Sequence, residues 1–132
     1  MPLLIRAFPM HPDFESELTD FANTLAGPRR NETQGFYAGL GVRRETWALQ
    51  RIGAEPWLIA MTQTEGDLDT TASQYAAADD AFSRWFKTKV QSLSAIDPNV
   101  EPLGPPARVV FDYRPEHVSA SANLAIAPPA AE

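Results

Sequence analysis

Residues 41–66 read GVRRETWALQRIGAEPWLIAMTQTEG, and the rest of the fold is inferred outward from this stretch. In its two halves, about residues 43–51 and 57–64, apolar side chains such as Trp47, Leu49, Trp57 and Ile59 recur at every second position, and Gly53 lies between the halves. This pattern predicts two strands joined by a turn. Apolar runs at residues 3–8 and 109–113 predict one strand on each side. With a helical region before and after the hairpin, the order β-α-β-β-α-β predicts an α+β, ferredoxin-like fold with a four-stranded antiparallel sheet.

The two helical regions are amphipathic. Apolar side chains recur every three or four residues from about residue 12 to residue 40 and again from about residue 68 to residue 93, which is the helical period. Residues 27–28 are Gly-Pro and are expected to break the first region. The second region is expected to break near the Asp79-Asp80 pair, where either carboxylate would cap the main helix.

Alternation along the hairpin also predicts how its faces are used. If paired residues have numbers with an even sum, the odd residues of both strands, which include Trp47, Trp57 and Met61, share one face. This bulky face is expected to lie under the helices. The other face is smaller and only mildly polar, which favours burial against a second sheet. The pattern therefore predicts a homodimer.

Length, composition and charge exclude several classes of protein. The 132 residues fit one domain, expected to cover residues 1–115, and the Ala/Pro-rich residues 116–132 are expected to be disordered. Lysine and arginine number 11 against 17 acidic residues, a net charge of −6, which argues against nucleic-acid binding. The absence of cysteine excludes disulfides and thiol chemistry. No run is long enough to span a membrane, so we expect a cytoplasmic protein with no membrane partner.

Three segments together resemble a family of small bacterial proteins, without an assigned reaction, in the dimeric α+β-barrel superfamily. They are LGVRRETWALQ (residues 40–50), DDAFSRWFKTKVQSLSAID (79–97) and GPPARVVFDYRP (104–115). The resemblance implies a ferredoxin-like fold and a dimer whose two sheets face each other. The superfamily includes cofactor-independent monooxygenases, polyketide and phenolic cyclases, and isomerases. The resemblance assigns this chain to none of these activities.

Glu45 and His11 are the candidate catalytic residues. Glu45 lies beside Trp47 on the apolar face, where burial would raise the pKa of its carboxyl and suit it to acid–base chemistry. The alternative is an ion pair with Arg84 or with one of the Arg43-Arg44 pair. His11 is the imidazole of the predicted folded part, since His117 lies in the predicted tail. The alternative is a loop residue before a helix that begins at a proline. The topology predicts opposite ends of the sheet for Glu45 and His11, so the two cannot act as a dyad within one subunit.

Large apolar side chains could line a pocket for a flat organic ligand. The candidates are Tyr37, Trp47, Trp57, Met61, Tyr75, Phe82, Trp85 and Phe86. The alternative is that they simply fill the core, because aromatic stripes at helical spacing usually do. No metal site or cofactor is predicted. The sequence therefore predicts a homodimeric small-molecule-binding protein, as a cofactor-independent oxygenase, cyclase or isomerase acting on an aromatic or polyketide-like substrate. The alternative function is a non-catalytic structural or interaction dimer with a filled core.

Overall fold

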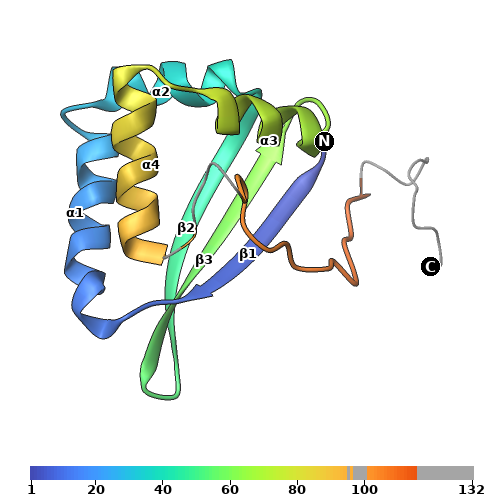
Figure 1. The fold of residues 1–132 in the computed structure, drawn as a ribbon. Helices are drawn as coiled ribbons and strands as arrows, with labels where there is room; N and C mark the ends of the chain where they lie inside the picture. The colour runs from blue at the N-terminus through green and yellow to red at the C-terminus, as the bar shows by residue number, and fades with distance from the viewer. Residues whose placement is uncertain (95, 97–100, 116–132) are drawn as a thin grey trace.

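The protein is an α+β structure in which helices lie on one side of a three-stranded antiparallel sheet (Figure 1). The computed structural model describes residues 1–94, 96 and 101–115. The strands are β1 (Leu3–Pro9), β2 (Val42–Ile52) and β3 (Glu55–Thr64), and β3 is central in the order β1-β3-β2. The helices are the short 3-10 turn η1 (Pro12–Phe14), α1 (Glu15–Ala26), α2 (Arg30–Gly39), α3 (Leu68–Ala77) and α4 (Ala81–Ser94).

The predicted α+β class is confirmed, but the predicted four-stranded, ferredoxin-like sheet is wrong. Residues 109–113 are not a strand, and in the described part of the chain one backbone hydrogen bond joins their segment to β1, from the Ala107 N–H to the Ile5 carbonyl oxygen at 2.7 Å. A strand needs a ladder of such bonds, and Pro105 and Pro106 have no N–H to donate. The apolar run at residues 109–113 is typical of a strand, but it does not specify which strand would pair with it.

The predicted even-sum register of the hairpin is also wrong. Strand β2 ends at Ile52 and β3 begins at Glu55, so the loop is only Gly53-Ala54. Gly53 has φ +65°, which is the conformation that the first residue of a type II′ turn requires. A two-residue loop pairs residues whose numbers have an odd sum, such as Glu45 with Thr62. The prediction failed because it assumed a longer loop, from the end of one strand at residue 51 to the start of the next at residue 57.

This register sorts the strand residues into two faces. The helix-covered face carries Leu4, Arg6, Phe8, Glu45, Trp47, Leu58, Ala60 and Thr62. The opposite face carries Leu3, Ile5, Ala7, Thr46, Ala48, Trp57, Ile59 and Met61 at its centre and Pro9, Arg44, Gln50, Ile52, Glu55 and Gln63 toward its ends. We call the second set the open face, because the helices lie on the other side of the sheet (Figure 1). Trp57 and Met61 are therefore not under the helices, contrary to expectation.

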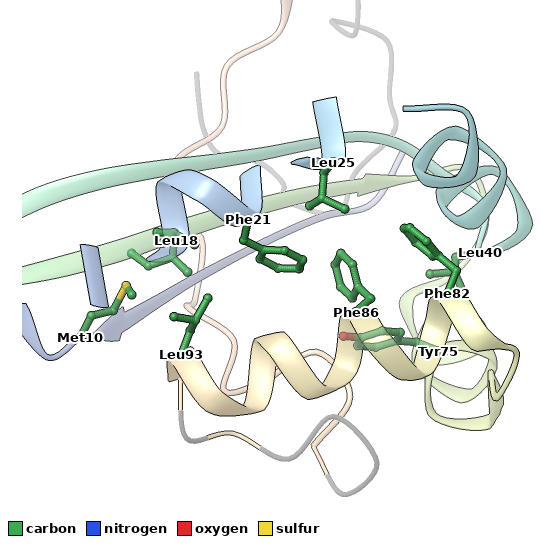
Figure 2. Packing of buried hydrophobic residues seen from close by; sticks show 10 residues of the cluster. Met10, Leu18, Phe21, Leu25, Leu40, Tyr75, Phe82, Phe86 and Leu93 are labelled. Carbon is green, nitrogen blue, oxygen red and sulfur yellow. The ribbon is translucent and has the colours of Figure 1, made fainter. Parts of the chain in front are cut away.

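The core lies between the helix-covered face and the helices. Its central contact joins α1 and α4, where the rings of Phe21 and Phe86 lie 5.4 Å apart and point toward one another (Figure 2). Around this pair lie Met10, Leu18, Leu25, Leu40, Tyr75, Phe82 and Leu93. The predicted breaks are confirmed, since α1 and α2 separate at Gly27 and Pro28, and Asp80 caps α4 by accepting the Ser83 N–H at 3.3 Å.

No helix in the described ranges combines the length and the apolar character that crossing a bilayer requires. The tail predicted for residues 116–132, which includes His117, lies outside the described residues.

Candidate functional site

A cavity of about 100 Å³ lies between the sheet and the helices. Most of its wall is apolar and includes Phe8, Leu18, Phe21, Phe36, Leu40, Val42, Leu58, Ala60, Phe86, Val90 and Leu93. Its polar side chains are Arg6, Tyr37, Glu45, Trp47, Thr62, Thr71, Tyr75 and Ser94. For comparison, an apolar cavity of roughly 150 Å³ holds a benzene molecule. The cavity is about two thirds of that size, so it has room for at most one ring.

Glu45 is the centre of the polar cluster. Its Oε1 accepts a hydrogen bond from the Thr62 hydroxyl at 2.5 Å, and its Oε2 accepts one from the Trp47 indole N–H at 2.7 Å. The Arg6 guanidinium approaches the same Oε2 through Nη2 at 3.5 Å. The Arg6 and Glu45 side chains are only 9% and 15% exposed. The carboxyl is therefore held by three donors in a largely dry environment.

The strand register explains how Arg6 reaches Glu45. Arg6 on β1 pairs with Ala60 on β3, and Glu45 on β2 pairs with the neighbouring Thr62 of the same face. The Ala60 methyl is small, so the Arg6 side chain can extend across the central strand. On the way it donates to the Thr62 hydroxyl through Nη2 at 2.5 Å. Its Nη1 also donates to the carbonyl oxygen of Leu103 at 3.2 Å, in the loop that completes the cavity wall.

Burial controls the acidity of Glu45. Removal from water raises the pKa of its carboxyl, while the Arg6 charge and the hydrogen bonds from Thr62, Trp47 and Arg6 lower it. The burial effect is the larger, and the pKa lies above its ordinary value. A carboxyl with a raised pKa can give and take protons closer to neutral pH than an exposed glutamate can.

Two tyrosines and Arg6 add donors without partners. Burial, and next the charge of Glu45, raises the pKa of both the Tyr37 and the Tyr75 phenol, so both remain protonated at neutral pH. Among the described residues, no hydrogen bond joins either hydroxyl to the protein, and the Arg6 Nε is buried without a partner. A buried donor without a partner is unfavourable. An oxygen atom inside the cavity would satisfy it.

The structure brings together five of the residues selected from the sequence. Glu45, Tyr37, Trp47, Tyr75 and Phe86 all line the cavity. Two others, Phe82 and Trp85, do not line it.

The rings of Phe82 and Trp85 instead contact the Arg29 guanidinium, whose Cζ lies 5.0 Å and 4.2 Å from the two ring centroids. Trp85 also packs edge-on against Phe21 at 5.3 Å. Trp57 and Met61 lie on the open face, away from the cavity. These four side chains contribute to packing or to the surface rather than to the cavity wall.

His11 lies outside the cavity. Its side chain is 62% exposed, and its Nδ1 accepts the Asp13 N–H at 3.2 Å, so it caps η1. This geometry fits the alternative given above for His11, a loop residue before a helix that begins at a proline. The expected ion pair of Glu45 is present, but its partner is Arg6. Arg43 instead pairs with Glu65, and Arg84 donates to the Asp79 carbonyl oxygen.

Sequence reasoning missed Arg6 and Thr62. Arg6 left a readable signal, because Leu4, Arg6 and Phe8 lie on one face of an apolar strand, and a charge on an otherwise apolar face must be paired. Thr62 left no comparable signal, because it faces the cavity only in the odd-sum register.

Within the described residues, no group of three histidine, aspartate or glutamate side chains could hold a metal ion. Comparisons with protein-family models, with curated proteins and with solved structures gave no match. The family resemblance of the sequence therefore stays a prediction, and the function is inferred from the cavity.

Proposed function

We propose that this is a homodimeric small-molecule-binding protein whose ligand is one flat ring with an oxygen substituent. The observation that carries the proposal is the buried, unpartnered Nε of Arg6 beside Glu45, in an otherwise apolar cavity that Tyr37 and Tyr75 also line. An apolar wall favours a hydrocarbon ring, and a few convergent polar groups orient it. The volume favours a single aromatic or enolic ring over a larger polyketide-like molecule.

A phenol illustrates the fit. Its hydroxyl can donate to the Glu45 carboxylate and accept from a tyrosine hydroxyl, while its ring contacts Phe21 and Phe86. Benzene has the same ring but leaves the buried donors without a partner. Sites built around buried polar groups discriminate strongly against analogues that lack the matching group.

The proposal extends to acid–base catalysis by Glu45. With a ring ketone, the carboxylate would remove a proton from the carbon next to the carbonyl. The electron pair of that C–H bond would move onto the carbonyl oxygen, where the Arg6 and tyrosine donors stabilise the negative charge. In a ring ketone with a double bond between its β and γ carbons, the proton can return to the γ carbon instead, which moves the double bond next to the carbonyl. This isomerisation needs no oxidant. Deuterium incorporation next to the carbonyl of cyclohexanone in D₂O, followed by NMR, measures the first half of this reaction.

The homodimer is part of the same proposal and is supported by the open face. Its central residues are apolar or uncharged, and Met61 is 36% exposed. Pairing of two such faces would remove them from water. A cytoplasmic location, expected because no run of the sequence is long enough to span a membrane, completes the proposal.

The binding experiment compares phenol with benzene by titration calorimetry. We expect saturable binding of phenol, at least tenfold tighter than benzene, and loss of that preference in Glu45→Gln. Val90→Phe, which places a ring in the cavity wall, should abolish binding. Gln91→Phe adds the same ring to the exposed side of α4 and is the matched control. Equal heats for Val90→Phe and the control would refute the cavity as the binding site.

A further inference from the structure

The segment from residue 107 to residue 113, which we call the arm, exposes large apolar side chains. Val109, Val110, Phe111 and Tyr113 are 43%, 77%, 83% and 70% exposed. Single exposed apolar residues are ordinary, but a contiguous group marks an interaction site. The arm therefore lacks a surface that covers it.

The rest of the chain holds the start of the arm only. Gly104 approaches Phe8 so closely that a Cβ there would lie 2.9 Å from the Phe8 ring, and the Ala107 N–H bonds the Ile5 carbonyl oxygen. Beyond this point the segment leaves the edge of β1 and runs away from the sheet (Figure 1). The arm is anchored at its base, next to the border of the open face.

The open face is suited to contact with another copy of this chain. The protein carries a net charge of −6, so two copies repel each other over most of their surface. The open face avoids this repulsion, because charged side chains of its strands occur only toward its ends, at Arg44 and Glu55. Its centre is a place where two copies can meet without burying like charges.

The area of the open face indicates that the arm takes part in the contact. Three strands ~4.8 Å apart and about seven residues of ~3.3 Å each give roughly 300 Å². Stable interfaces bury about 800 Å² on each partner. Phe and Tyr side chains bury roughly 150–250 Å² each, so Phe111 and Tyr113 with the two valines bring the total close to the required size.

We propose that the arms are exchanged between two copies, with each arm lying across the open face of the other copy. The proposal rests on the homodimer proposed above and adds the element that completes its interface. Seven extended residues reach ~23 Å, which exceeds the width of the three-stranded sheet. The exchange is reciprocal, so it closes as a two-fold dimer instead of growing into a filament.

Light scattering and analytical ultracentrifugation of five proteins test the arm. The full chain and a chain ending at residue 115, the matched truncation control, should both be dimers. A chain ending at residue 106 should be a monomer at the same concentration. In Phe111→Asp the dissociation constant of the dimer should rise at least about 30-fold, the size of a hot-spot loss. Since Phe111 is exposed in the single copy, this variant should keep the far-UV circular dichroism and melting temperature of a folded subunit, and Gln91→Asp on α4 is its control.

The outcomes separate the arm from the homodimer. A dimer whose dissociation constant is the same with and without residues 107–115 would overturn the arm exchange and leave the homodimer standing. A full chain that remains a monomer at about 100 μM would overturn both. Phenol binding reports on the cavity independently of either result.

Discussion

Arg6 and Glu45 form a buried ion pair between two strands that are not neighbours. The Arg6 Nη2 lies 3.5 Å from the Glu45 Oε2, although β3 separates β1 from β2. The same guanidinium donates to the Leu103 carbonyl oxygen. One side chain thus connects the two edges of the sheet with the loop that closes the cavity.

Arg6→Met should destabilise the protein by roughly 3–5 kcal/mol at pH 7, because removal of one partner leaves the other charge buried and unpaired. Urea unfolding measures the loss. The double variant Arg6→Met/Glu45→Gln should be more stable than Arg6→Met alone, since it removes the orphaned charge as well. If the two single losses simply add in the double variant, the pair is not coupled.

Glu45 should make stability depend on pH in a defined direction. Its pKa in the folded chain lies above the ordinary value of about 4.3. Between that value and the folded pKa, the folded chain holds more protons than the unfolded chain. The free energy of unfolding from this group therefore falls as pH rises through that window.

The comparison with Glu45→Gln isolates this effect. The stability of the wild type minus that of the variant should be largest near pH 4 and should decrease to a plateau above the folded pKa. Denaturant unfolding at half-unit pH steps measures the difference. A difference that grows with pH would mean that the hydrogen bonds and Arg6 outweigh burial.

Gly104→Ala should cost about 1–3 kcal/mol, because Gly104 has φ +74° and a Cβ would lie 2.9 Å from the Phe8 ring. Gly41→Ala separates the two causes, since Gly41 has φ +73° but no atom within 4 Å of the added Cβ. Gly66→Ala, with neither feature, is the control. Thermal unfolding should rank the losses as Gly104, then Gly41, then Gly66, and any other order would contradict the contact with Phe8.

Lys87→Met should destabilise the protein by about 1–3 kcal/mol. The buried Lys87 ammonium donates to the carbonyl oxygens of Ala76 and Ala78 at 2.9 and 2.7 Å, at the end of α3. Methionine keeps the apolar stem and removes the donor, so these carbonyls lose a partner. Lys89→Met, on the exposed side of the same helix, should change stability by less than about 0.5 kcal/mol. Equal urea midpoints for the two variants would show that the Lys87 bonds contribute nothing.

The helices were predictable because their signals are local. The apolar period of 3.6 predicted α1 and α4. The helix breaks expected at residues 27–28 and near Asp80 correctly separated α1 from α2 and α3 from α4. The strands of the hairpin were also predictable from their composition. Their register was not, because it depends on whether Gly53-Ala54 is the whole loop, and one residue more or less exchanges the two faces of β3.

The site was predicted in part for a related reason. Glu45, Trp47 and Tyr37 come from patterns that are visible along the chain. Arg6 lies 39 residues from Glu45 in sequence, and its pairing depends on the order of the strands. The prediction of a fourth strand failed for the same reason. A strand pattern in the sequence does not specify which sheet edge, or which copy of the chain, will pair with it.

The hydrogen bond from the Trp47 indole to Glu45 gives the protein an optical signal of its own. Indole emission depends on the charge that its N–H faces, so Trp47 would report the protonation of the carboxyl and the arrival of a ligand beside it. The chain has three tryptophans, and the other two, Trp57 and Trp85, lie outside the cavity wall. With both replaced by phenylalanine, a single fluorophore would allow the cavity to be titrated by fluorescence without any attached dye.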